Sequence, residues 1–121
     1  LMLLVAHDTN ISYLRTMLGF GWKQGDYIAN NIPPVGTLQF ERYKEVKTGE
    51  YFLRIAFEAQ SMDQIRNLTQ LTATQKPLRS DFQSAGDCRK TSAGLLCPLK
   101  DAMVKVEQNI DPAALTPYTF N

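Results

Sequence analysis

The spacing of hydrophobic positions changes along the chain, and these changes predict its elements. Residues 1–6 (LMLLVA) are continuously apolar, which is typical of a parallel strand buried on both faces. The polar residues 7–10 (HDTN) follow directly, and then Ile11, Leu14 and Leu18 recur at helical spacing. A polar residue of 8–10 can cap that helix, and the glycines after it can end it. The opening of the chain therefore predicts a strand, a short polar turn and a helix.

A β-hairpin and further helices are predicted after a loop over residues 22–36, where Gly, Asn and Pro break regular structure. Apolar and polar positions alternate over 37–41 and again over 51–58, and a turn over 47–50 joins them. The sequence SMDQ at 61–64 fits a capping box that opens a short helix reaching Leu68. Residues 69–97 are expected to be mostly loop, and Pro98 suits the first turn of a last helix. The fold class is therefore α/β.

Composition narrows the class of protein. The chain has 121 residues, the size of one domain, and its 44% hydrophobic and 21% charged residues are typical of globular proteins. Thirteen Lys and Arg against twelve Asp and Glu give a net charge of +1, with no dense basic stripe for nucleic acid. The apolar run over 1–6 is far shorter than the roughly 20 residues that span a bilayer. We expect neither nucleic acid nor a membrane as a partner.

The first residues suggest a longer protein. Leu1 and Met2 open directly into the apolar run, without a polar lead-in. Chain termini usually fray unless something ties them down. We therefore expect residue 1 to be an interior position of a longer protein, the alternative being a short protein whose first residues are not given.

Cys88 and Cys97 bracket the segment CRKTSAGLLC. A disulfide between them would close a short loop and stabilise the folded chain by about 2.7 kcal/mol in the chain-entropy model. The other interpretation is that the two cysteines are unrelated buried thiols. Their spacing is not that of a CxxC redox or zinc pair. A disulfide would favour an oxidising compartment.

His7 and Asp8 are the best candidates for residues that take part in a reaction. They stand where a strand would end and a helix begin, and free N–H groups and the helix dipole favour phosphate at that point. A protonated His7 would add positive charge, and Asp8 could donate a proton to a leaving oxygen. The structural alternative is a helix cap at Asp8 and a satisfied strand-end residue at His7. Because His7 is the only histidine, this chain alone cannot build a metal site of two or more imidazoles, which argues against a metal-dependent HD phosphohydrolase.

The residues also resemble a known family. HDTNISYLRTMLGF (7–20) resembles the second active-site motif of the histidine acid phosphatases, the branch that contains bacterial phytases. PPVGTLQFER (33–42) is similar to that family's PPGGxLxFER stretch, and Cys88 and Cys97 resemble its terminal disulfide. The likeness is closest to periplasmic phytase-like enzymes of enteric bacteria. It implies that residues 1–121 are the C-terminal portion of the family's α/β domain, and that the protein is periplasmic.

The resemblance implies hydrolysis of a phosphomonoester through a phosphohistidine. In that family a histidine of an N-terminal RHGxRxP motif attacks phosphorus, and nearby arginines clamp the phosphate. Carried over to this chain, His7 contacts the phosphate, Asp8 protonates the leaving alkoxide, and Thr9 faces the substrate pocket. The implied substrate is phytate or a similar monoester, and no metal or other cofactor is implied.

This chain departs from the family pattern in several places. Ala6 and Val35 stand where relatives usually have Gly, and both are expected to be tolerated. With His7 as the only histidine, the RHGxRxP motif and its nucleophile are absent. We therefore expect a missing N-terminal part to supply them, and the isolated chain to be inactive and to self-associate through exposed apolar surface. The alternative is a non-catalytic module of the same fold that binds phosphate or a protein partner.

Overall fold

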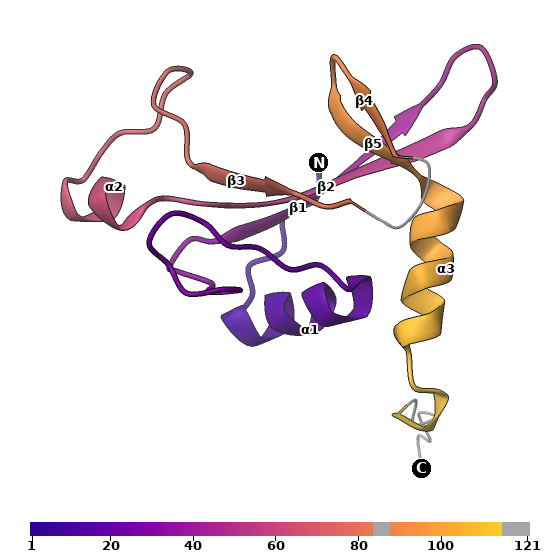
Figure 1. Cartoon of the computed structure of the whole chain (residues 1–121), viewed down its shortest axis with the longest axis horizontal. Coiled ribbons are helices and arrows are strands. Elements are labelled where there is room, and N and C mark those ends of the chain that lie inside the picture. Colours follow the sequence, from indigo (N-terminus) through magenta and orange to yellow (C-terminus); the bar gives the residue numbers. More distant parts are fainter. Residues whose placement is uncertain (84–87, 115–121) are drawn as a thin grey trace.

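The computed structural model describes residues 1–83 and 88–114. In chain order its elements are α1 (Asp8–Leu18), β1 (Thr37–Lys44), β2 (Tyr51–Ala59), α2 (Met62–Arg66), β3 (Leu78–Asp81), β4 (Arg89–Thr91), β5 (Gly94–Pro98), α3 (Leu99–Asn109) and a 3-10 turn (Pro112–Ala114). Figure 1 shows α1 beneath the sheet and α3 continuing from the end of β5. The α/β class predicted from the sequence is confirmed. No helix in these ranges has the length and apolar character to cross a bilayer.

Strand β2 is the centre of an antiparallel sheet. One edge of β2 pairs through residues 51–58 with the whole of β1, as the predicted hairpin requires. The other edge is shared between β3, which pairs with residues 56–59, and β5, which pairs with residues 52 and 53. Strand β4 then pairs with β5. Most described residues of 69–97 lie outside strands, as expected, but β3, β4 and most of β5 also lie in this range. Pairing with neighbouring strands, not local alternation, makes these short segments extended.

The apolar core lies on the side of the sheet that α1 covers. Its buried members come from α1, the loop after it, β2 and the residue after β3: Leu18, Phe20, Trp22, Ile55, Phe57, Ala59 and Phe82. The Trp22 ring stacks on the Phe57 ring with centroids 4.0 Å apart. Phe20 packs edge-on against Trp22 and against Phe82. Each such pair contributes about 0.5–1.5 kcal/mol beyond its buried area, so the loop after α1 is a structural part of the core.

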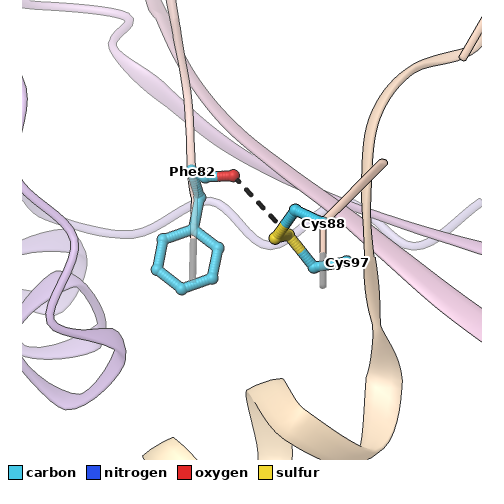
Figure 2. The surroundings of a disulfide bond; sticks show 3 residues. All are labelled: Phe82, Cys88 and Cys97. Atoms are coloured by element: carbon cyan, nitrogen blue, oxygen red, sulfur yellow. Dashed lines mark hydrogen bonds between the residues drawn. A yellow bond between two sulfur atoms is a disulfide. The ribbon is translucent and has the colours of Figure 1, made fainter. Parts of the chain in front are cut away.

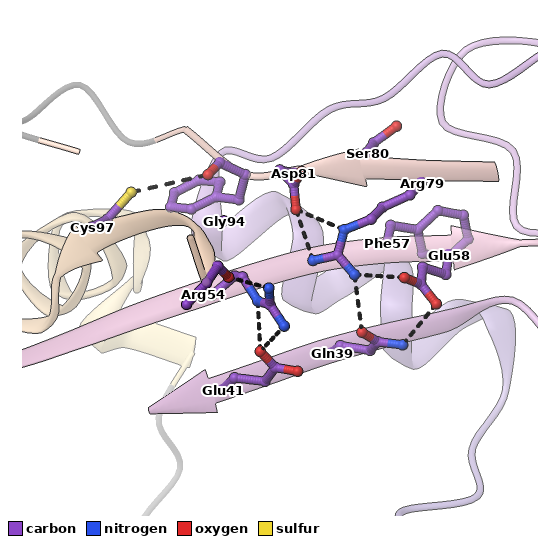
Figure 3. A network of polar contacts seen from close by, with 12 residues as sticks. Gln39, Glu41, Arg54, Phe57, Glu58, Arg79, Ser80, Asp81, Gly94 and Cys97 are labelled. Carbon is purple, nitrogen blue, oxygen red and sulfur yellow. Dashed lines mark hydrogen bonds and ion pairs between the residues drawn. The ribbon is translucent and has the colours of Figure 1, made fainter. Parts of the chain in front are cut away.

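The opposite face of the sheet is polar. Arg54 of β2 pairs with Glu41 of β1, and Arg79 of β3 pairs with Glu58 at 2.5 Å and with Asp81 at 2.8 Å. Figure 3 shows these side chains side by side across the three strands. Side chains alternate between the two faces along a strand. The alternation that places apolar residues in the core therefore places these charged residues in a row, here called the ladder, on the opposite face. Its ion pairs favour the observed register.

Cys88 and Cys97 form a disulfide, which confirms the prediction. Cys97 lies in β5 opposite Leu53 and is only 1% exposed. Its Sγ lies 4.0 Å from the carbonyl oxygen of Phe82, as Figure 2 shows. The bond therefore ties the residue before β4 to the buried side of β5.

The predicted strand over residues 1–6 is not formed. Leu1 to Val5 are each at least 78% exposed, and within the described ranges they pair with no strand. Strand N–H and C=O groups need a neighbouring strand to bond, and none of the described strands runs beside this segment. The prediction of a strand buried on both faces is therefore wrong for this chain.

The predicted helices are present with small differences at their ends. The capping box of α2 is confirmed, since Ser61 Oγ accepts from the Gln64 N–H and Gln64 Oε1 accepts from the Ser61 N–H. This helix ends at Arg66, two residues before the predicted end. Pro98 precedes α3 as its N-cap residue, consistent with the predicted helix start.

Candidate active site

The predicted site residues stand at the N-terminal end of α1. His7 is the N-cap residue, in extended conformation with φ −93° and ψ 163°, and Asp8 is the first residue of the helix. The expectation that Asp8, Thr9 or Asn10 occupies the cap position is therefore wrong by at least one residue, because the helix begins directly after His7. The helix dipole gives this end a partial positive charge, although the N–H groups of Thr9 and Asn10 are already bonded within the turn. An anion is favoured there.

The Asp8 carboxylate is exposed and is held by its neighbour Thr9. Its Oδ1 accepts from the Thr9 N–H at 2.7 Å and from the Thr9 hydroxyl at 3.2 Å. Within the described ranges, Asp8 makes no ion pair. The second carboxyl oxygen is thus open toward solvent, where it can exchange a proton with a bound group.

Asn10 holds the backbone of His7 from both sides. The Asn10 side-chain Oδ1 accepts from the His7 N–H at 3.0 Å. The Asn10 N–H donates to the His7 carbonyl oxygen at 3.1 Å. These bonds close a small ring around the His7–Asp8 peptide. The sequence pattern names Asn10 only as one of three candidate N-cap residues. Its position three residues after the observed cap is the signal for a reciprocal cap.

The other end of α1 is fixed to the core. Leu18 is buried, and Gly19 ends the helix in the left-handed conformation with φ 62°. Asn109, at the end of α3, donates from Nδ2 to the Met17 carbonyl oxygen at 2.7 Å. The helix is thus anchored at its C-terminal end, and it presents His7 and Asp8 at the exposed end.

The second family-like segment, residues 33–42, forms a tight turn and β1. The Gly36 N–H donates to the Pro33 carbonyl oxygen at 2.9 Å, and Val35 has φ 61°. Proline at the second position and positive φ at the third are features of a type II turn. A Cβ on Gly36 would lie 2.9 Å from Phe57 Cζ, so the next position has no room for a side chain. Val35 is accommodated because its side chain is 87% exposed, although its backbone is strained.

Grooves of the described surface lie away from His7 and Asp8. An apolar groove of about 250 Å³ runs between α1, α3 and the sheet and includes Leu14, Phe40 and Met103 in its lining. A second, of about 360 Å³, lies between the loop after α1 and α2. Neither groove is lined by His7, Asp8 or Thr9, which are all exposed in this chain. Among the described residues no group of three or more His, Cys, Asp and Glu could hold a metal ion.

Comparisons with known proteins agree with the motif resemblance. The chain is 28% identical over 98 residues to phytase AppA of Escherichia coli K12. It matches the crystal structure of a Klebsiella phytase with a TM-score of 0.86 and 40% identity over 96% of this chain. It also matches a Hafnia alvei phytase in complex with myo-inositol hexakis sulphate, with a TM-score of 0.72 and 27% identity over 92% of this chain. No protein-family model matches the chain.

The matched segment is a minor part of each relative. It covers 22% of the E. coli protein, 29% of the Klebsiella chain and 27% of the Hafnia chain. The resemblance to bacterial phytases is confirmed by sequence and by structure. The roles of His7, Asp8 and Thr9 remain predictions.

Proposed function

We propose that this chain, which is homologous to one segment of the bacterial phytases, contributes the phosphate contact and the proton donor of a phosphomonoesterase. The observation that carries the proposal is the match to the Klebsiella phytase, with 40% identity and a TM-score of 0.86. In this chain His7 and Asp8 are neighbours at an exposed helix start. A hydrolase of the histidine acid phosphatase type uses a histidine and a carboxylic acid in these positions.

In the proposed reaction, a nucleophilic histidine from outside this chain attacks phosphorus. A nitrogen–phosphorus bond forms as the bond from phosphorus to the ester oxygen breaks, and Asp8 gives its proton to that leaving oxygen. Water then attacks phosphorus, the nitrogen–phosphorus bond breaks, and one water proton returns to Asp8. His7 and the positive end of the α1 dipole stabilise the phosphate oxygens, with Thr9 beside them on the substrate side.

The proposed substrate is phytate or a similar alkyl phosphomonoester. Support comes from the matched relatives, which are phytases. One of these structures contains myo-inositol hexakis sulphate, a polyanion built on the same inositol ring as phytate. The Cys88–Cys97 disulfide favours an oxidising compartment, and we propose the periplasm.

The proposal assigns this chain to the C-terminal portion of the catalytic domain. The nucleophile and the arginine clamp then come from an N-terminal portion, because His7 is the only histidine among the 121 residues. We therefore expect the isolated chain to release no phosphate from phytate.

The test is phosphate release from phytate at mildly acidic pH by the complete enzyme with Asp8 or with Asp8→Asn, and by the 121-residue chain alone. Asp63→Asn is the matched control, because Asp63 is an exposed acid in the first turn of another helix, α2. We expect a loss of about 100-fold or more for Asp8→Asn, in the range of general acid catalysis, and little change for Asp63→Asn.

Each other outcome has a distinct meaning. Full activity in Asp8→Asn would make Asp8 only a helix residue and would overturn its proposed role. Phosphate release by the pure isolated chain would refute the division of the site between two portions. An inactive complete protein that still binds phosphate would favour a non-catalytic binding module of the same fold.

A further inference from the structure

We infer that Asn10 is a positioning residue for the proton donor, acting through the backbone of the His7–Asp8 turn. This inference rests on the proposed function and extends it to a residue to which neither the motif nor the mechanism gave a role. Asn10 lies at the third helical position of α1. Its side chain and its backbone N–H both bond to the main chain of His7.

The geometry couples Asn10 to the direction of both site residues. The Asn10 Oδ1 accepts from the His7 N–H at 3.0 Å, and the Asn10 N–H donates to the His7 carbonyl oxygen at 3.1 Å. His7 is the residue at which the backbone changes from extended to helical, with φ −93° and ψ 163°. Because both peptide groups of His7 bond to Asn10, rotation of either peptide plane breaks a hydrogen bond. The peptide plane in turn sets where the Asp8 side chain leaves the helix.

Asn10 is the residue that restrains both peptide groups of His7, whereas the other local bonds reach one group each. The Ile11 N–H donates to the His7 carbonyl oxygen at 3.5 Å, and Thr9 donates to the Asp8 carboxylate. On the N-terminal side of this turn, Leu1 to Val5 are exposed and pair with no described strand. On its C-terminal side, α1 is fixed to the core through Ile11 and Leu18 and through the Asn109–Met17 hydrogen bond. The side chain of Asn10 connects this fixed helix to the His7 N–H, on the exposed side of the turn.

A general acid gains most from accurate placement when the leaving group is a poor one. An alkoxide needs its proton as the ester bond breaks, whereas an activated aryl oxide leaves readily without it. Misplacing Asp8 therefore lowers kcat/KM, which reports the step that breaks the ester bond, for an alkyl phosphate and leaves it nearly unchanged for an activated aryl phosphate. Release of phosphate from the phosphohistidine is the same step for both substrates. A poorly folded enzyme loses activity on both substrates equally.

The test compares kcat/KM of the complete enzyme on phytate and on 4-nitrophenyl phosphate for Asn10→Ala and Asn10→Asp. We expect Asn10→Ala to lower kcat/KM on phytate by about tenfold and on the aryl ester by less than about threefold, a part of what a positioned acid supplies. Asn10→Asp keeps an acceptor oxygen at the same place, and we expect it to restore most of the phytate rate.

Thr16→Val is the matched control within the same helix. Thr16 Oγ1 donates to the Ser12 carbonyl oxygen at 2.9 Å, so the variant also removes a local side-chain bond to the main chain, but away from the site. We expect it to change both rates by the same small factor. Equal losses on the two substrates for Asn10→Ala, or no loss on either, would overturn the inference.

Asp8→Asn, assayed on the same two substrates, separates this inference from the proposed function. If Asp8→Asn shows the leaving-group dependence and Asn10→Ala does not, the positioning role fails and the proposed function stands. If Asp8→Asn lowers neither rate, the proposed role of Asp8 fails, and the inference fails with it.

Discussion

Replacing Val35 by glycine should make the fold more stable, although it removes a hydrophobic side chain. Val35 has φ 61°, the left-handed region, at the third position of the turn before β1. For a residue with a Cβ this conformation costs about 1–2 kcal/mol, and branching at Cβ adds to the crowding. The side chain is 87% exposed, so Val35→Gly loses little buried apolar area.

The expected size follows from two opposing terms. Removing the Cβ relieves about 1–2 kcal/mol of backbone strain, and the greater freedom of glycine in the unfolded chain offsets about 0.5–1 kcal/mol of that. The net gain in the free energy of unfolding is about 0.5–1 kcal/mol. It corresponds to a rise of a few degrees in Tm for a domain of this size.

Urea unfolding followed by tryptophan fluorescence measures this gain. Trp22 is the only tryptophan and stacks on Phe57 in the core, so its emission reports the loss of that packing. Dilute protein avoids self-association. Val35→Ala is the control that keeps a Cβ, and we expect it to gain clearly less than Val35→Gly.

A substitution at the adjacent position, Gly36, should change the stability in the opposite direction. A Cβ on Gly36 would lie 2.9 Å from Phe57 Cζ and 2.9 Å from the Pro33 carbonyl oxygen, so Gly36→Ala should destabilise the fold. A Val35→Gly variant no more stable than the parent, or no more stable than Val35→Ala, would refute the strain argument.

Other consequences can be measured in the same chain. Replacing Cys88 and Cys97 by serine opens a loop with a sequence separation of 9 and should lower the free energy of unfolding by about 2.7 kcal/mol; an unchanged urea midpoint would contradict this. The hydrogen bond from Tyr43 to Glu41 raises the pKa of Tyr43 above its usual value. That bond therefore stabilises the fold below the unfolded pKa of about 10 and is lost as pH rises through the folded value. Glu41→Gln should lower the Tyr43 midpoint in an NMR titration, and an upward shift would contradict the assignment. Light scattering should show self-association that Leu3→Lys reduces, whereas a clean monomer of the parent at high concentration would count against it.

The sequence predicts correctly those elements whose patterned apolar residues are buried in the core. The α1 pattern contains Leu18, and the β2 alternation contains Ile55 and Phe57, all buried in the core. In contrast, every residue of β4 is exposed, so no alternation of apolar and polar residues marks it. Its extended form depends on pairing with β5, a contact that local pattern does not contain.

A short motif is enough to identify the candidate site residues. The contacts between distant residues that hold the surrounding fold are not visible in the sequence. His7 and Asp8 were selected by residue type and position, and the structure keeps them together at one helix end. The ladder on the polar face joins Arg79 to Gln39 and Glu58, residues from different strands. Such pairs depend on register, which follows only once the sheet has formed.

The exposed apolar residues 1–6 directly precede the proposed catalytic pair, His7 and Asp8. Under the proposed function, the part of the complete enzyme that covers residues 1–6 therefore also lies beside the site. Val5 and Val46 make this testable, because they are 94% and 95% exposed in this chain, one beside the site and one at the β1–β2 turn. In the 121-residue chain, Val5→Asp and Val46→Asp should both leave the urea midpoint nearly unchanged. In the complete enzyme, Val5→Asp should place a carboxylate in a covered apolar segment, which costs several kcal/mol, and should lower both Tm and phytase activity. Val46→Asp should change neither. Equal behaviour of the two variants in the complete enzyme would mean that residues 1–6 stay exposed there.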